Sequence, residues 1–279
     1  MWPVENAYGQ RKRLEFCSGV IERLGPARVL DVGCGTGNNL TRPLALRFPQ
    51  VRFLGIDSDA GSIEFARRAA PLPNLEYGGD DALARAGVVD LVIASEVLEH
   101  VEQPLAFLSS LRERLGPEGR MIVTLPNGRG PFEFASLVEV LLRLSGLFDV
   151  LRRLKRSVAG GGAPETRDTL AISPHLHFFS HKAVQILFAS AGLAVERYQA
   201  RTFLCGFGFD YLIRGPAAVR WNAAVADRLP PPLVSAWMFE LAPAAPRAAP
   251  LYRPGPYARW RRRLNERCWG GDLASDRYR

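Results

Sequence analysis

The stretch that most restricts the fold is RVLDVGCGTGNNL, residues 28–40, in which a short apolar strand runs into a turn with three alternating glycines. A buried strand that ends in such a turn binds a nucleotide-like cofactor in several enzyme classes, and a dinucleotide requires the pattern G-x-G-x-x-G. Counted from Gly33, the last glycine of that pattern is replaced by Asn38, and counted from Gly35 it is replaced by Leu40. Neither register of the dinucleotide pattern is complete. The glycines present are Gly33, Gly35 and Gly37.

An acidic residue, Asp31, ends this strand two positions before the first glycine. A carboxylate at this place would repel a pyrophosphate and would favour a ligand that carries positive charge. S-adenosylmethionine (SAM) has an ammonium, a sulfonium and no phosphate. The turn therefore favours SAM over a dinucleotide as the cofactor.

The chain around the turn alternates short apolar runs with helical spacing, which is typical of a parallel sheet with helices on its faces. Helical spacing occupies 62–70 and 104–116. After Pro126 the alternation breaks, and 193–203 and 233–242 are the final strand candidates. These features predict an α/β fold. The first five predicted strands are 28–33, 51–57, 74–79, 89–95 and 120–126.

Residues 128–180 do not fit the alternation, and we expect them to form an inserted helix and loop that covers the substrate. The predicted helix, 131–156, has apolar residues at steps of four and three and a bend at 145–146. A glycine-rich loop at 157–169 and a helix at 180–192, capped by Ser180 and ended by Gly192, follow. The apolar stripe consists of Leu137, Leu141, Leu144, Phe148 and Leu151.

Two interpretations of this stripe remain. Such a stripe usually packs against the core, and this is the interpretation we favour. The alternative is that 132–156 covers an apolar or lipid-linked acceptor and makes a peripheral contact with an anionic membrane surface, because basic side chains lie on or near its polar side.

Five motifs in order resemble those of class I SAM-dependent methyltransferases, tightly over 15–127 and loosely over 173–242. The resemblance implies a Rossmann-like fold with a seven-stranded, mainly parallel sheet and helices on both faces. We expect one such domain over residues 1–245, followed by a basic Pro/Arg-rich tail at 246–279. The motifs are VLDVGCGTGNNL, GID, GGDDAL, VDLVIASEVLEHV and GPEGRMIVTLPN.

The resemblance also implies which residues bind SAM. Asp57, at the end of the second strand, would bind both ribose hydroxyls. Asp81 would bind the adenine amine, although the doubled acid leaves Asp80 open. Ser95 and Glu96 follow the fourth strand and would lie near the methionine end of the cofactor. The implied cofactor-binding residues are Asp31, Gly33, Gly35, Gly37, Asp57, Ser58, Asp81, Ala82 and Ser95.

Methyl transfer mainly requires that donor and acceptor are held in line, and a hydroxyl or amine acceptor also loses a proton to a base. The best candidates for a catalytic group are His100 and Glu96. Together with Glu99 they form a pattern, E-x-x-E-H, that resembles the magnesium-binding motif of ubiquinone-pathway and small-RNA 2′-O-methyltransferases. A later histidine completes the site in the RNA enzymes, and His175 is the best positional match. Glu99 and His100 could equally cap the following helix, so we assign no metal.

The net charge of +8 is concentrated in the tail, where nine arginines stand against three acidic residues over 246–279. This distribution argues against nucleic acid as a partner. The charge run YARWRRRLNERCW is most simply a solvated extension, and the alternative is a helix that binds an acidic partner or RNA. Four widely spaced cysteines and the lack of an apolar leader favour a cytoplasmic location.

Three functions fit these patterns. The first is a methyltransferase that acts on the oxygen, nitrogen or carbon of a small molecule, such as a glycan, a quinone or a lipid-linked metabolite. The second is an RNA methyltransferase, and the third is a non-catalytic relative that keeps SAM as a ligand. The sequence identifies neither the acceptor nor the oligomeric state.

Overall fold

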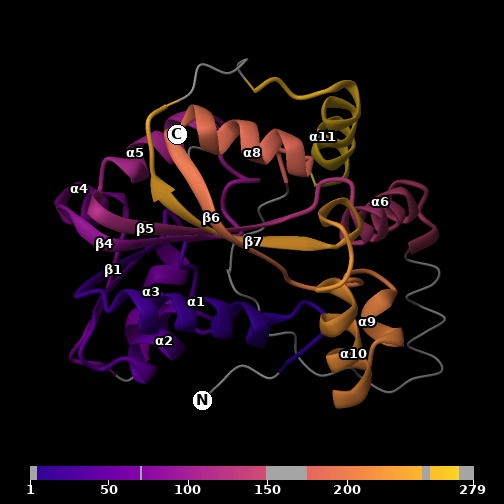
Figure 1. The fold of residues 1–279 in the computed structure, drawn as a ribbon. Coiled ribbons are helices and arrows are strands. Elements are labelled where there is room, and N and C mark those ends of the chain that lie inside the picture. The colour runs from indigo at the N-terminus through magenta and orange to yellow at the C-terminus, as the bar shows by residue number, and fades with distance from the viewer. Residues whose placement is uncertain (1–4, 70, 149–174, 247–251, 270–279) are drawn as a thin grey trace.

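The computed structural model describes residues 5–69, 71–148, 175–246 and 252–269. Its centre is a seven-stranded sheet of order β3-β2-β1-β4-β5-β7-β6 (Figure 1). Strands β1 to β5 are parallel, and β7 is antiparallel to both β5 and β6. The expected α/β class and mainly parallel sheet are confirmed. The strands are β1 (Arg28–Val32), β2 (Arg52–Ile56), β3 (Leu75–Gly78), β4 (Val89–Ser95), β5 (Leu115–Pro126), β6 (Leu193–Ala200) and β7 (Ala236–Pro243).

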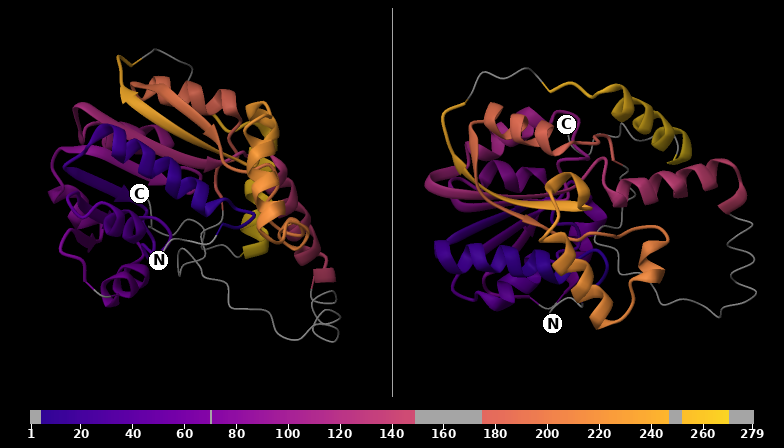
Figure 2. Two further views of the ribbon diagram at one scale, coloured as in Figure 1. Left: turned by 60° about the horizontal axis from the view of Figure 1, so that its bottom comes forward. Right: turned by 45° about the vertical axis from the view of Figure 1, so that its right-hand side comes forward.

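Helices cover both faces of this sheet (Figures 1 and 2). One face carries α1 (Gln10–Leu24), α2 (Thr41–Arg47) and α3 (Ala60–Arg68), and the other carries α4 (Asp80–Arg85), α5 (Pro104–Arg112) and α8 (His181–Ser190). The remaining elements gather beyond one end of the sheet (Figure 1). They are α6 (Pro131–Leu144), α9 (Phe209–Leu212), α10 (Pro216–Ala226), the 3₁₀ turn η1 (Pro231–Leu233) and α11 (Pro256–Trp269).

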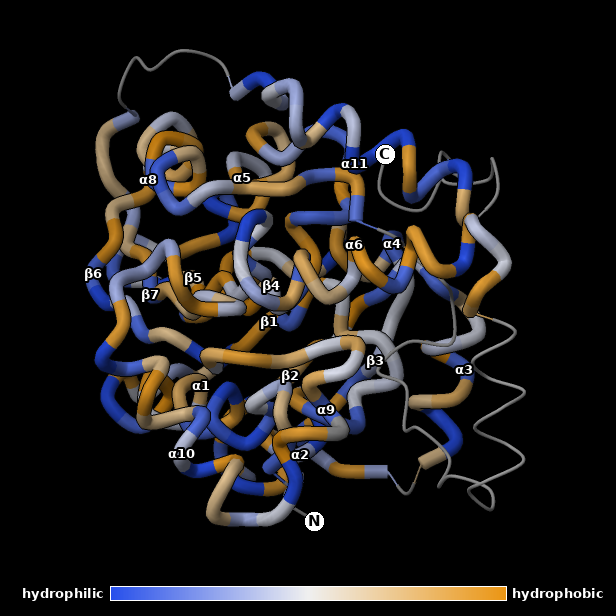
Figure 3. The backbone as a smooth tube through the Cα atoms, turned by 90° about the vertical axis from the view of Figure 1, so that its right-hand side faces the viewer, coloured by the Kyte–Doolittle hydropathy of each residue, from blue (hydrophilic) through white to orange (hydrophobic). Residues whose placement is uncertain are grey.

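Each face of the sheet has its own apolar core. Leu14 of α1 and Leu44 of α2 are fully buried in one core, and Leu108 of α5 and Leu187 of α8 are buried in the other. Hydrophobic segments accordingly gather along the central strands, whereas the helices show both colours (Figure 3). The predicted cap of α8 is present, because Ser180 Oγ accepts a hydrogen bond from the Ala183 N–H.

The favoured interpretation of the α6 stripe is wrong for its described part. Leu141 and Leu144 are 47% and 39% exposed, whereas Glu133 on the same helix is buried. The reason is that α6 leaves the end of the sheet and packs against α11 rather than against a sheet face (Figure 2). Leu151 and the predicted loop at 157–169 lie outside the described residues. The membrane contact through 132–156 therefore stays a prediction.

The expectation of a solvated extension for the basic tail is also wrong where the structure describes it. Residues Pro256–Trp269 form α11, in which Arg261 is fully buried and Asn265 is 4% exposed. A fully buried arginine requires partners for its charge, and these come from α6. The tail thus packs on the fold. No helix among the described residues is long and apolar enough to cross a membrane.

Candidate functional site

The glycine turn follows β1 and needs glycine for two separate reasons. Gly33, Gly35 and Gly37 all have positive φ angles, of 73°, 55° and 70°, which side chains rarely adopt. A Cβ atom on Gly33 would lie 2.3 Å from Val97 Cγ2, and one on Gly37 would lie 2.1 Å from the Tyr77 hydroxyl. The turn is therefore closed in by the residues that follow β4 and by β3. Within the turn, the Gly33 and Cys34 N–H groups donate to the Ile56 carbonyl, which ties the turn to the end of β2.

Asp31 lies behind this turn and lines neither of the two pockets described below. Its carboxylate is 3% exposed and accepts a hydrogen bond of 2.6 Å from the Thr41 hydroxyl. Burial raises the pKa of Asp31 from 3.8 to about 7, although Thr41 and Arg13 act to lower it. We expected the Asp31 carboxyl to lie beside the cofactor. It is instead held inside the fold, where its hydrogen bond with Thr41 links β1 to α2.

We expect the variant Asp31→Asn to be more stable than the parent chain at alkaline pH. A carboxyl whose pKa is raised on folding contributes stability below its unfolded pKa, and this contribution is lost as the pH rises through the folded pKa of about 7. Asparagine has no charge to bury. Thermal unfolding should show a Tm difference in favour of the variant that grows between about pH 5 and about pH 8. An equal difference at both pH values would contradict the raised pKa.

A pocket of about 540 Å³ opens at the carboxyl ends of β1, β2 and β3. Gly33, Asp57 and Ser58 line it together, and these are three of the nine residues for which the resemblance implies cofactor binding. Leu83 and Phe107 supply apolar walls. Its size and its mixed lining are typical of a site for a small cofactor.

Asp57 is the best-anchored acid of this pocket. Its Oδ2 atom accepts a hydrogen bond from the Gly35 N–H at 2.8 Å, and its Oδ1 atom accepts one from the Asp59 N–H at 2.8 Å. Burial nevertheless raises the pKa of Asp57, because the two N–H groups offset only part of the desolvation. The side chain is thus fixed between the glycine turn and the start of α3.

The two neighbouring acids after β3 point in different directions. Asp80 lines the 540 Å³ pocket, whereas Asp81 is exposed and forms an ion pair of 2.8 Å with Arg85 one helical turn further on. This ion pair lowers the pKa of Asp81. Ala82 is buried, and a Cβ on Gly78 would lie 2.3 Å from its methyl group. The structure thus brings Asp80, and not Asp81, together with Asp57.

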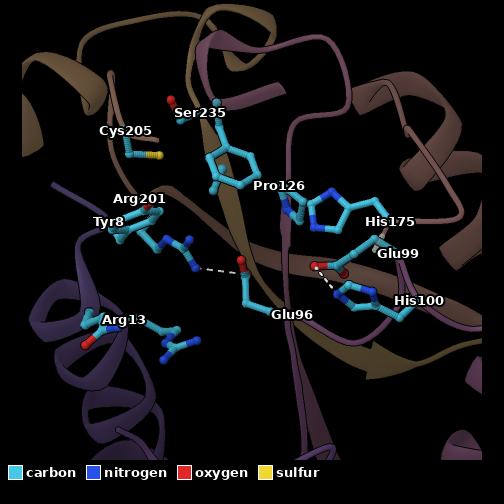
Figure 4. A pocket seen from close by; sticks show the side chains of 13 residues that line it. Tyr8, Arg13, Glu96, Glu99, His100, Pro126, His175, Arg201, Cys205 and Ser235 are labelled. Carbon is cyan, nitrogen blue, oxygen red and sulfur yellow. Dashed lines mark ion pairs between the residues drawn. The ribbon is translucent and has the colours of Figure 1, made fainter. Parts of the chain in front are cut away.

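A second pocket, of about 210 Å³, lies beside the carboxyl ends of β4 and β5 (Figure 4). Its walls come from segments that are far apart in the sequence: Arg13 on α1, Glu96 after β4, Phe132 on α6, His175 and Arg201. Most of its charged side chains are buried. The remaining lining residues are Tyr8, Gln10, Glu99, His100, Pro126, Cys205, Ser235 and Ala236.

A chain of hydrogen bonds runs from α1 across the carboxyl ends of β4 and β5 to Glu96 in the second pocket. Arg13 donates to Ser95 Oγ at 3.1 Å, and Ser95 lies 2.8 Å from the Thr124 hydroxyl. Thr124 donates to Glu96 Oε1 at 2.7 Å, and Arg201 forms an ion pair of 2.9 Å with the same oxygen (Figure 4). These bonds fix the carboxyl end of β4, which is a central strand of the sheet.

Glu96 is strained as well as paired. Its φ of 59° is the single positive value at a non-glycine position in the described ranges. Burial acts to raise the pKa of Glu96, but Arg201 and Arg13 outweigh it and hold the pKa below its usual value. Strain of this kind persists only where the surroundings fix it, and it concentrates at functional sites.

Glu99, His100 and His175 form the other half of the pocket. Each offers an atom within 4.8 Å of the others, and such a set could hold a divalent cation. Glu96, the fourth residue of the sequence pattern, is instead ion-paired with Arg201. Burial and the nearby Glu96 raise the pKa of Glu99 to about 8. Burial would lower the pKa of His175, but the adjacent Glu133 raises it to about 9.

Sequence reasoning did not find Arg13 or Arg201. Neither belongs to one of the five motifs. They come together only in the folded chain, where α1 and the segment after β6 meet at the end of β4. The other histidines are elsewhere: His177 is 5% exposed and stacks on Phe179, and His181 begins α8.

Comparison with known proteins identifies relatives of this chain. A family model described as a methyltransferase domain matches residues 9–198. A trans-aconitate 2-methyltransferase of Methylobacterium nodulans is 35% identical over 171 residues, which cover 61% of this chain and 59% of that protein. A ubiquinone biosynthesis O-methyltransferase of Cereibacter sphaeroides is 40% identical over 116 residues, which cover 40% of this chain and 45% of that protein. The chain thus spans less than two thirds of either relative.

Two solved structures share the fold. PKMT2 from Rickettsia typhi aligns with a TM-score of 0.52 at 16% identity and covers 87% of this chain and 55% of that one. A SAM-dependent methyltransferase from Mesorhizobium loti aligns with a TM-score of 0.50 at 16% identity and covers 84% of this chain and 97% of that one. At such low identity the likeness extends to the fold alone.

Proposed function

Because the chain belongs to the methyltransferase-domain family, we propose that it transfers a methyl group from SAM to a small-molecule acceptor. The observation that carries the proposal is the pair of pockets at one edge of the sheet. One is lined by Gly33, Asp57 and Asp80, and the other by Arg13, Glu96 and His175. This arrangement suits a donor and an acceptor that meet at the ends of β1 and β4.

On the donor side, we propose that Asp57 binds the ribose hydroxyls and that Asp80 binds the adenine. Leu83 and Phe107 would contact the adenine ring, since they form the apolar walls of that pocket. The enzyme would then position an already activated methyl group, and most of its rate enhancement would come from proximity.

We expect the neighbouring variants Asp80→Asn and Asp81→Asn to differ in their affinity for SAM. Asp80 lines the donor pocket, whereas Asp81 is exposed and bound to Arg85. Loss of one charge-assisted hydrogen bond costs about 1.5–3 kcal/mol, which corresponds to about a 10- to 100-fold loss of affinity. Isothermal titration should show this loss for Asp80→Asn alone. Equal losses in the two variants would contradict the assignment.

On the acceptor side, the second pocket favours a polar acceptor over an apolar one. Among its lining residues, Arg13, Glu96, Glu99 and Arg201 are ionisable and largely buried. A polar acceptor could add hydrogen bonds to these groups, whereas an apolar ring could not. An oxygen or nitrogen acceptor would also have to release a proton. Among the residues that line the pocket, Glu99 and His100 are candidates to receive it, and Glu96, which is ion-paired with Arg201, is a third.

The proposal is tested by titrating the purified protein with SAM and, separately, with NADH, and then by measuring S-adenosylhomocysteine formation with candidate acceptors in the presence and absence of magnesium. Binding of SAM but not of NADH, followed by turnover with a carboxylate- or hydroxyl-bearing acceptor, is the expected result. Lack of SAM binding would refute the function. Binding without turnover across the acceptors would favour the non-catalytic alternative.

Two further expectations remain proposals. An RNA acceptor would show binding that falls steeply with salt, and the same titration with a short RNA would reveal it. We favour a small molecule, since the buried Arg13 and Arg201 face a pocket of only about 210 Å³. A cytoplasmic location likewise stays a prediction.

A further inference from the structure

We propose that α11, which lies beyond the matched family region at 9–198, is a working part of the acceptor pocket, with Arg261 acting as a positioning residue for His175 through Glu133. The proposal rests on the proposed function only in that His175 faces the acceptor. Its physical basis is a line of three buried or partly buried charged groups that runs from α11 into the pocket.

The first link of this line is between α11 and α6. Arg261 Nη2 lies 3.5 Å from Glu133 Oε2, and it also donates to the Ser136 hydroxyl at 3.3 Å. The side chains of Arg261 and Glu133 are 0% and 1% exposed. A buried carboxylate in this position would be very unfavourable without a paired cation, so each group fixes the place of the other.

The second link is between α6 and the pocket. His175 Nδ1 donates to Glu133 Oε1 at 2.5 Å, and His175 lines the pocket. The His175 and His100 rings meet edge to face, with centroids 4.9 Å apart. A carboxylate that holds one ring nitrogen of a histidine sets the orientation of the other.

The same helix also holds the backbone of His175. Asn265 donates to the His175 carbonyl at 3.3 Å and accepts a hydrogen bond from Arg261 Nη1 at 3.2 Å. The Arg261 guanidinium further lies over the Phe178 ring, 5.1 Å from its centroid. Residues of one helix thus fix both the backbone and, through Glu133, the ring of a pocket residue. A solvated tail would make none of these contacts.

The test uses NMR of the full chain with labelled histidine, which has only four histidine rings to assign. The parent chain should show a nuclear Overhauser effect (NOE) between the rings of His100 and His175. Arg261→Met should abolish it, because Glu133 loses the group that fixes it. Arg263→Met, an exposed arginine on the same helix, is the matched control and should retain it. The contact between His181 and Trp237 reports that the fold is intact.

Glu133→Gln should abolish the same NOE. The double variant Arg261→Met with Glu133→Gln should give the same histidine spectrum as Glu133→Gln alone. Arg261→Lys keeps the charge and should retain the NOE. If Arg261→Met does not fold, the NOE measured in Glu133→Gln tests the proposal instead. A purely structural role for Arg261 would lower the Tm but leave the NOE in place, and that result would overturn the proposal. A parallel SAM titration separates the two claims, because its failure would refute the proposed function and leave the ring geometry as measured.

Discussion

Replacing Asp57 with alanine should weaken SAM binding by about 100-fold or more, while leaving the chain folded. A carboxylate that accepts both ribose hydroxyls forms two charge-assisted hydrogen bonds, each worth about 1.5–3 kcal/mol. Their loss corresponds to at least about two orders of magnitude in the dissociation constant. The variant also frees the Gly35 and Asp59 N–H groups, so the glycine turn loses part of its support. Isothermal titration with SAM measures the result.

The matched control is Asp90→Ala. Asp90 also accepts hydrogen bonds from two backbone N–H groups, those of Ala27 and Arg28, at 2.8 and 2.9 Å. It does so at the opposite end of β1, away from the carboxyl ends of the strands. Equal weakening in both variants would show that Asp57 acts on stability alone, and would remove the support for its contact with ribose.

Part of the lining of the 540 Å³ pocket could be predicted from the sequence, because the spacings that bring these residues together are local. Gly33, Gly37 and Asp57 are fixed by short spacings around single strand ends, and parallel strands bring such ends to one edge. The exception is the pair Asp80 and Asp81. Which of two adjacent acids faces the pocket depends on the rotation of a short helix, α4, and the Arg85 ion pair that holds Asp81 at the surface is visible only in three dimensions.

The acceptor side could be predicted only in part. Glu96, Glu99 and His100 belong to one motif, and the structure places them in one pocket with His175. Arg13 and Arg201 come from positions 83 residues before and 105 residues after Glu96, and no local pattern joins them to it. Their presence changes the chemistry that is open to Glu96. The sequence pattern suggested Glu96 as a metal ligand or as a base, but its carboxylate is ion-paired with Arg201.

The buried face predicted for α6 is wrong for a similar reason, because the partner of the helix is distant in the sequence. The period of an apolar stripe identifies a helix but not the partner of the helix. The actual partner, α11, lies more than a hundred residues later and contributes charged groups, so α6 buries Glu133 and exposes Leu141. Helical period therefore predicted a helix where α6 lies, at Pro131–Leu144, but not the face that this helix buries. The predicted helix from residue 149 onward lies outside the described residues.

The second large effect is expected at the strained end of β4, where Arg201→Met should lower the free energy of unfolding by about 3–5 kcal/mol, the range for a broken buried ion pair. Arg201 and Glu96 are 7% and 25% exposed, and the pair fixes a glutamate at a φ of 59°. Arg13 still acts on Glu96 in the variant, so the loss should fall toward the lower end of that range. Urea unfolding measures it.

Two comparisons distinguish this effect from ordinary loss of contacts. Arg120→Met removes a pair of similar length, 2.7 Å to Glu196, whose side chains are 22% and 42% exposed, and it should cost less than about 1 kcal/mol. The double variant of Arg201→Met with Glu96→Gln should be more stable than Arg201→Met alone, since it no longer buries an unpaired carboxylate. If Arg201→Met is no less stable than Arg120→Met, the prediction is wrong. Arg13 and Thr124 would then satisfy the Glu96 charge without Arg201, and Arg201 would be held at the pocket for the acceptor instead.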